Sequence, residues 1–232
     1  MRGLINSVLV VVLLCLWSTN GAAKDGANDA TEYVEKVQAF YADAKTFTAS
    51  FTQVVKNKTF GRESTSSGKV FFMKPGRMRW DYESKKKRKK ITKSFLSDGK
   101  TLWAVFPSEH EYYKGSLKNV ALPVAISFLG GQGNLTASFD VALAKNSGLG
   151  DDGDPVLRLT PKKTTARYTT LWLVLDPEDF HVKKSVVLNA QGDTNAFSFA
   201  TPTLGKRLKK SIFVFDAKKN PKYKLIQPAK SP

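Results

Sequence analysis

The most constraining feature of this sequence is a stretch in which apolar and charged side chains alternate. Residues 77–82 read RMRWDY, so Met78, Trp80 and Tyr82 are separated by charged residues. Side chains two positions apart lie on the same side of a pleated strand. The pattern therefore predicts a strand with one apolar and one charged face. A second aromatic-rich stretch, residues 94–106, follows a basic interruption and predicts further strands of the same kind.

Turn residues divide these stretches into separate strands. Pro75-Gly76 predicts a turn or bulge, and Asp98-Gly99 predicts a tight hairpin, because glycine tolerates positive φ. Strand patterns recur along the rest of the chain at a spacing of about ten residues. The expected strands are residues 46–55, 69–74, 77–83, 91–96, 101–106, 109–114, 137–144, 155–160, 169–175, 181–189, 195–201, 209–215 and 223–227. This series predicts an antiparallel, mainly β fold with few helices.

One amphipathic helix is expected before the first strand. Asn28 or Asp29 can cap its start, and Glu32 completes a capping box with Asp29. The apolar residues that follow repeat at spacings of three and four, which predicts one buried stripe: Tyr33, Val34, Val37, Phe40, Tyr41 and Ala44. Residues 117–129 interrupt the strand series, and we expect them to be helical or irregular.

The N-terminal segment has the three parts of a secretory signal peptide. Arg2 precedes an apolar core over residues 4–17, and small residues follow at 21–23. We expect residues 1–23 to be removed, with cleavage after Ala23. The mature protein is then exported.

The position of the only cysteine bears on lipid attachment and on disulfides. Cys15 lies in the expected signal peptide, and Leu14 precedes it where a lipid-attachment motif needs a small residue. A mature chain without cysteine has no disulfides, so one sizeable core must hold it together. We expect a single domain over residues 24–227 and a disordered tail at 228–232.

Several motifs resemble one known family. The most specific is SDGKTLW at residues 97–103, which follows Lys74-Pro75 and the MRWDY run at residues 78–82. Further stretches are similar to the family in the same order: residues 47–53 to its first strand, 122–130 to its lid segment, 157–162 to its strand ending in Thr-Pro-Lys, and 213–215 to its closing Phe-x-Phe strand. The chain after residue 29 thus resembles LolA, the periplasmic outer-membrane lipoprotein carrier.

The resemblance implies an open, unclosed antiparallel half-barrel with a helical lid over an apolar cavity. In the family this cavity takes the acyl chains of lipoproteins, and Met78 and Trp80 fall at positions that line it. The residues that we assign to the lipid-binding cavity are Phe47, Phe51, Phe72, Met78, Trp80, Leu102, Phe139, Leu173 and Phe199. An ordinary packed core is the alternative interpretation of the same residues.

The resemblance also implies partners and a location. The carrier would be a periplasmic chaperone that takes acylated lipoproteins from an inner-membrane ABC transporter and delivers them to an outer-membrane receptor lipoprotein. It would work as a monomer without a cofactor. The alternative is a sensor of lipids or lipoproteins on the same fold, or a carrier of other lipids.

Lys74 stands at a position where the family often has arginine. That arginine fastens the lid by hydrogen bonds in the closed state. Lysine offers a mobile point charge where arginine offers a rigid five-donor fork, so the lid latch should differ here. A solvated lysine at a turn is the alternative.

The charge of the chain is strongly positive. The formal net charge is +17 at pH 7, and six consecutive basic residues lie between two expected strands: Lys85, Lys86, Lys87, Arg88, Lys89 and Lys90. They should project from a hairpin loop, either as a solvated loop or as a contact that steers the protein toward acidic membrane surfaces or acidic partners. Nucleic acid is a poor partner, because the run has no interleaved aromatic residues for base stacking and the chain is exported.

Enzyme chemistry finds little support in the sequence. The two histidines, His110 and His181, have no second ligand at a metal-binding spacing. We find no pairing of a nucleophile with a base. The sequence therefore predicts a binding protein without catalytic or metal-ligating residues.

Overall fold

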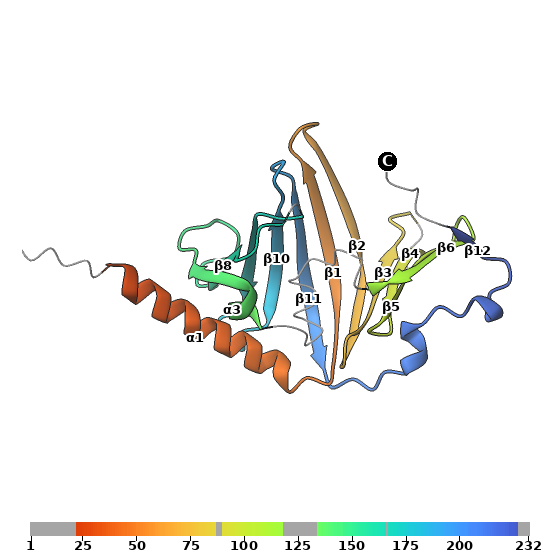
Figure 1. Cartoon of the computed structure of the whole chain (residues 1–232), viewed down its shortest axis with the longest axis horizontal. Coiled ribbons are helices and arrows are strands. Elements are labelled where there is room, and N and C mark those ends of the chain that lie inside the picture. The colour runs from red at the N-terminus through yellow and green to blue at the C-terminus, as the bar shows by residue number, and fades with distance from the viewer. Residues whose placement is uncertain (1–21, 87–89, 118–133, 166, 227–232) are drawn as a thin grey trace, which may run out of the picture.

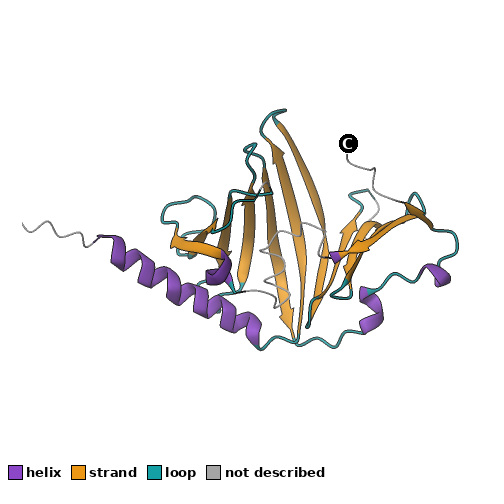
Figure 2. Cartoon of the chain, in the orientation of Figure 1, coloured by secondary structure: helices purple, strands orange, loops and turns teal. Residues whose placement is uncertain are grey.

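One twelve-stranded sheet dominates the computed structural model, which describes residues 22–86, 90–117, 134–165 and 167–226 (Figures 1 and 2). The strands are β1 Thr46–Asn57, β2 Arg62–Met73, β3 Arg77–Glu83, β4 Ile91–Ser97, β5 Thr101–Phe106, β6 Glu111–Ser116, β7 Phe139–Leu143, β8 Val156–Pro161, β9 Thr170–Leu175, β10 Val182–Leu188, β11 Thr194–Leu204 and β12 Lys224–Ile226. The period-two patterns thus predicted most strands to within a few residues.

The sheet is open. Its order is β12-β6-β5-β4-β3-β2-β1-β11-β10-β9-β8-β7, so β12 and β7 are edges that do not pair with each other. The central ladder joins β1 to β11 and brings the two halves of the chain side by side. An open, mainly β sheet is confirmed. The prediction of a wholly antiparallel sheet fails at one edge, where β12 pairs parallel to β6. The parallel direction arises because the segment before β12 first crosses the sheet.

A long helix, α1 Ala22–Ala42, lies against the half of the sheet that ends in β7 (Figure 1). Val34, Val37 and Tyr41 are buried among strand residues, which confirms the predicted apolar stripe up to Tyr41. Ala44, the last predicted member, lies beyond the end of the helix at Ala42. The helix begins at Ala22, before the cap predicted at Asn28 or Asp29. No helix in the described ranges has the length and apolar character needed to cross a membrane.

One strand prediction is wrong and another is shifted by two residues at its start. Residues 209–215 contain the 3-10 helix η2 Lys210–Phe213, because Arg79 Nη1 donates to the Ile212 carbonyl at 2.9 Å and holds this backbone outside any ladder. A second 3-10 helix, η3 Ala217–Lys219, follows it. The predicted strand at 137–144 begins later, since Asn134 caps the short helix α3 Leu135–Ser138.

The outer face of the sheet is also covered. A segment spanning residues 205–223, the C-terminal arm, lays Phe215 and Tyr223 against a second apolar cluster of Leu96, Trp103 and Val105. The alternation predicted that this face of β3 is charged, and in the structure the face is partly buried. Asp81 is buried there, accepting from Arg79 Nε at 2.7 Å and from Ser94 Oγ at 2.6 Å.

The predicted signal peptide, apart from its last two residues, and the predicted tail at 228–232 lie outside the described residues. So does the segment 118–133, which includes the stretch similar to the family's lid. These predictions stay untested.

Candidate functional site

The nine residues assigned to a cavity lie in one buried cluster on the inner face of the sheet. They come from seven strands, and each is at most 7% exposed: Phe47, Phe51, Phe72, Met78, Trp80, Leu102, Phe139, Leu173 and Phe199. They share this cluster with Val34, Val37 and Tyr41 of α1. A strand period of two thus placed the right residues on one face, whereas their binding of lipid stays a prediction.

Trp80 is central to the aromatic part of the cluster. Its ring centroid lies 5.1 Å from those of Phe51 and Phe197, in edge-to-face contacts. Phe72 and Phe199 lie 5.8 and 6.2 Å away. The indole of β3 therefore reaches across β2 to rings of β1 and β11, and it is 3% exposed. The rings of Trp80 and its four neighbours thus pack directly against one another.

Two polar atoms face this apolar interior without a hydrogen-bond partner. Among the buried side chains of the described residues they are Trp80 Nε1 and Ser185 Oγ. Ser185 lies on β10 opposite Phe197 on one side and Leu173 on the other. Leaving such an atom unpaired costs about 1–3 kcal/mol, which a ligand with an acceptor oxygen could offset. Sequence reasoning did not single out Ser185, although a serine in the apolar phase of a buried strand is a usable signal.

The rim of the inner face carries Tyr82 and Lys93. Burial raises the pKa of Tyr82 to about 12, so its phenol is neutral. Lys93 Nζ lies 4.3 Å from the centre of this ring, and burial lowers the pKa of Lys93. A cation above an aromatic face is a favourable contact, and it brings positive charge to the border of the apolar cluster.

Lys74 contacts the end of the helix that covers the inner face. Its Nζ donates to the carbonyl oxygens of Tyr41 at 2.5 Å and Ala42 at 2.6 Å. The last carbonyls of a helix lack partners within the helix, and a cation there also favours the helix dipole. The alternative of a lysine that is merely solvated at a turn is therefore wrong. The predicted lid segment lies outside the described residues, so the role of Lys74 as a lid latch stays a prediction.

The turn between β9 and β10 holds α1 from the other side. Phe180 packs on Tyr33 with ring centroids 6.0 Å apart, and Lys36 Nζ lies 4.7 Å from the Phe180 ring. The His181 ring lies 5.9 Å from that of Phe40. One residue further, Tyr41 Oη accepts from the backbone N–H of Val182 at 3.1 Å. The helix is thus attached through a small number of separable contacts.

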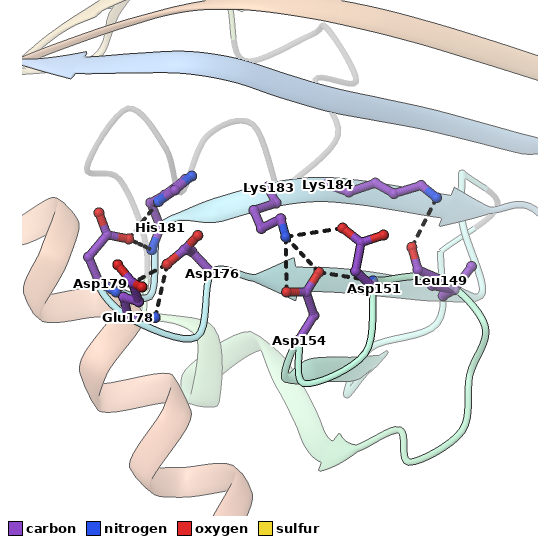
Figure 3. A network of polar contacts seen from close by, with 9 residues as sticks. All are labelled: Leu149, Asp151, Asp154, Asp176, Glu178, Asp179, His181, Lys183 and Lys184. Carbon is purple, nitrogen blue, oxygen red and sulfur yellow. Dashed lines mark hydrogen bonds and ion pairs between the residues drawn. The ribbon is translucent and has the colours of Figure 1, made fainter.

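His181 is not isolated, contrary to the sequence expectation (Figure 3). Asp176, Asp179 and His181 each offer one atom that could bind a metal ion, and these three atoms lie within 4.8 Å of one another. Asp176 accepts from the backbone N–H groups of Glu178 and Asp179, and His181 Nδ1 lies 2.5 Å from Asp179 Oδ1. Because a carboxylate only accepts, Nδ1 must carry the proton. These hydrogen bonds stabilise the turn that contacts α1, and they explain why the three side chains lie close together.

Further along Figure 3, Lys183 pairs with Asp154 at 2.9 Å and with Asp151 at 3.4 Å. The hydrogen bond to Asp154 is the main reason that the pKa of Lys183 is raised. Lys184 Nζ donates to the Leu149 carbonyl at 3.0 Å. Together these contacts hold the loop between β7 and β8 against β10.

The pKa of Asp179 predicts how acid affects this turn. Burial alone would raise that pKa, but the backbone and ring of His181 donate to the carboxylate and lower it below its usual range. The stabilisation is therefore present above the unfolded pKa of about 3.9 and is lost as the pH falls through the folded value. At pH 7 we expect Asp179→Asn to lower the unfolding free energy by less than about 1 kcal/mol, as for solvent-screened pairs. Urea unfolding should show this difference shrink at about pH 2; a constant difference would contradict it.

The basic loop lies between β3 and β4, as expected. Lys85, Lys86 and Lys90 are exposed, while residues 87–89 lie outside the described part. The loop therefore presents positive charge to solvent, and its partner stays a prediction.

Comparisons with known proteins agree on one family. The family model described as "Outer membrane lipoprotein carrier protein LolA" matches residues 42–216. An outer-membrane lipoprotein carrier protein of Methylococcus capsulatus is 27% identical over 159 residues, which cover 67% of each chain. One of Methylobacillus flagellatus is 29% identical over 107 residues, 46% of this chain and 45% of that relative, so the match spans less than half of its length. An uncharacterised conserved protein of Thermus thermophilus shares the fold, with a TM-score of 0.53, 10% identity and coverage of 85% of this chain and 98% of that one.

Proposed function

Because this chain belongs to the LolA family of outer membrane lipoprotein carriers, we propose that it is a periplasmic chaperone that encloses the acyl chains of lipoproteins on the inner face of its sheet. It would carry these lipoproteins from the inner to the outer membrane. The observation that carries the proposal is the large apolar cluster on the inner face of the open sheet, which α1 covers on the half that ends in β7. Family members are binding proteins, not enzymes.

The energy of acyl burial explains why the apolar face must be large and the cover removable. Each buried methylene contributes about 0.8 kcal/mol, so a chain of about 15 methylenes stabilises the complex by about 12 kcal/mol. Release into water would then be negligible. Chains have to pass directly between proteins, and we infer that an inner-membrane ABC transporter is the donor and an outer-membrane receptor lipoprotein the acceptor.

The packing of the inner face supports a cycle between two states: a closed state that is empty and an open state that is loaded. Trp80 and its aromatic neighbours are almost fully buried against one another. Acyl chains can enter only if these rings separate and α1, which reaches the cluster through the contact of Tyr41 with Phe47, moves away from the sheet. The unpaired Trp80 Nε1 and Ser185 Oγ also favour a ligand with acceptor oxygens, such as the ester carbonyls of an acylated cysteine.

A release assay tests the proposal. Purified mature protein is incubated with energised inner-membrane vesicles or spheroplasts that contain labelled lipoproteins. We expect lipoprotein in the soluble fraction, bound to the protein and dependent on its acyl groups. If no lipoprotein is released, the carrier assignment fails, and mass spectrometry of extracted ligands would identify the lipid bound instead.

Replacing Lys74 should alter release more than loading. Lys74→Leu removes two charge-assisted hydrogen bonds from the helix end and so destabilises the closed, empty state relative to the loaded one. One such bond contributes about 1.5–3 kcal/mol. We expect transfer from loaded carrier to outer-membrane vesicles to slow by about tenfold or more, since about 1.4 kcal/mol corresponds to a factor of ten.

The matched control for this variant is Lys74→Arg, which keeps a donor at the same carbonyls. It should transfer at close to the wild-type rate. Transfer from Lys74→Leu that equals wild type would remove Lys74 from the mechanism.

A further inference from the structure

The hairpin formed by β1 and β2 projects beyond its neighbours (Figure 1). Both strands have 12 residues, but β3 pairs with β2 only from Gly68 to Met73. Residues 62–67 therefore extend past the described β3 ladder, a distance of about 20 Å at about 3.3 Å per residue. The tip is held in place, because Asn57 Oδ1 accepts from Phe60 N and Asp193 Oδ1 accepts from Lys58 N, each at 2.8 Å.

This tip carries the most exposed large apolar side chain of the described residues. Phe60 is 72% exposed, whereas Leu225, the next, is 53% exposed. Basic residues surround it: Arg62 lies 6.0 Å from the Phe60 ring, and Lys58 is two residues before it. Glu63 pairs with Lys56 at 3.1 Å, while no ion pair between described residues includes Lys58 or Arg62. An exposed aromatic ring between unpaired cations is typical of a side chain that enters the interface of an anionic bilayer.

The topology places more positive charge at the same end of the sheet. In an antiparallel series, alternate turns lie at the same end, so the loop after β3 is on the side of the β1–β2 tip. Its exposed Lys85, Lys86 and Lys90 therefore extend the basic surface. The turn before β10 lies at the opposite end and carries Asp176, Glu178 and Asp179. Exposed basic residues of the C-terminal arm, Lys206, Arg207, Lys209 and Lys210, share that opposite end, because Leu204 pairs with Phe47 there. The tip is thus distinguished by an exposed aromatic ring among cations, and not by charge alone.

We propose that the β1–β2 tip, residues 56–62, docks on the surface of a bilayer that contains anionic phospholipid. Phe60 inserts among the headgroups, and Lys58 and Arg62 pair with lipid phosphates. This surface is separate from the inner face of the sheet, and its lipid contact does not depend on the carrier function. It orients the molecule with the acidic turns away from the membrane.

Vesicle flotation tests the docking surface directly. Purified mature protein is mixed at low salt with vesicles of phosphatidylethanolamine and phosphatidylglycerol, or of phosphatidylethanolamine and phosphatidylcholine. We expect binding only to the first, and its loss at high salt. Phe60→Ser should reduce the bound fraction about tenfold or more, since burying a phenylalanine side chain contributes about 1.5–3 kcal/mol. The double variant Lys58→Glu, Arg62→Glu should do the same, since each interfacial charge contributes on the order of 1 kcal/mol. Leu204→Ser and Lys206→Glu, at the opposite end of the sheet, are the matched controls and should bind as wild type.

A spectroscopic readout locates the side chain. In Phe60→Trp, brominated phosphatidylglycerol should quench fluorescence beyond the quenching seen in wild-type protein. The proposal is overturned if wild-type protein ignores anionic vesicles, if Phe60→Ser binds them equally well, or if Phe60→Trp shows no extra quenching. If a folded Trp80→Glu variant loses vesicle binding while Phe60→Ser keeps it, the lipid contact belongs to the inner face, and this result would also overturn the proposal. A carrier that still solubilises lipoproteins but ignores vesicles would leave the proposed function intact.

Discussion

Trp80→Glu is expected to abolish the recovery of soluble lipoprotein complexes. Trp80 touches four phenylalanine rings of the inner face, so acyl chains that enter there must lie against the residue at this position. A carboxylate would have to be buried beside them without a partner, at a cost of several kcal/mol. We expect the bound fraction in the vesicle release assay to fall by more than about 100-fold, which corresponds to about 2.7 kcal/mol.

A second variant separates loss of the site from loss of the fold. Trp80→Phe keeps an aromatic ring and removes the unpaired Nε1. A swap of one apolar ring for another costs less than about 1.5 kcal/mol, so complexes should persist within about tenfold of wild type. If Nε1 binds a carbonyl of the cargo, Trp80→Phe should lose affinity for a diacylglyceryl peptide and keep its affinity for a hydrocarbon chain that has no acceptor oxygen. A Trp80→Glu protein with native circular dichroism and normal complexes would refute the site.

The inner face of the sheet was predictable because it depends on a local rule. Met78, Trp80 and Tyr82 alternate with charged residues, and the alternation alone placed them on one side of β3. The same rule could not say what covers the other side. Asp81 lies on the charged face, as the alternation indicates, yet it is buried, and the neighbouring Arg79 contacts the C-terminal arm at Ile212, more than a hundred positions away. Pairing over that separation leaves no periodic signal in either segment.

The contacts that attach α1 were missed for a related reason. His181 had no metal-ligand partner at a recognised spacing, and its real neighbours are supplied by a turn and by a helix distant in sequence. Phe180 has a φ of 64°, which is uncommon for a residue other than glycine and is not encoded by any motif noted in the sequence. A turn of this geometry presents two adjacent rings to one helix. Only the folded chain brings Tyr33 and Phe40 opposite them.

Fixing α1 in place should therefore prevent loading altogether. The only cysteine, Cys15, lies in the predicted signal peptide, so in protein prepared from residue 24 onward Tyr33→Cys and Phe180→Cys can be bridged selectively with a short bis-maleimide. Their rings lie 6.0 Å apart, and the bridge would replace a separable contact by a covalent one. If acyl chains enter by displacement of α1, the bridged protein should yield no soluble lipoprotein complex in the release assay.

Two controls distinguish a closed cover from chemical damage. The Tyr33→Cys, Phe180→Cys protein treated with a mono-maleimide keeps α1 free, and it should bind lipoprotein in the release assay. Asp140→Cys with Thr160→Cys bridges exposed partners on β7 and β8 without touching the helix, and it should also load. Loading by the protein bridged between α1 and the β9–β10 turn would show that chains reach the inner face by another path. Because α1 is held by the buried Val34, Val37 and Tyr41 as well as by ring contacts and a few hydrogen bonds, opening by the cargo requires that the burial of acyl chains, about 12 kcal/mol for each, exceed the loss of all these contacts.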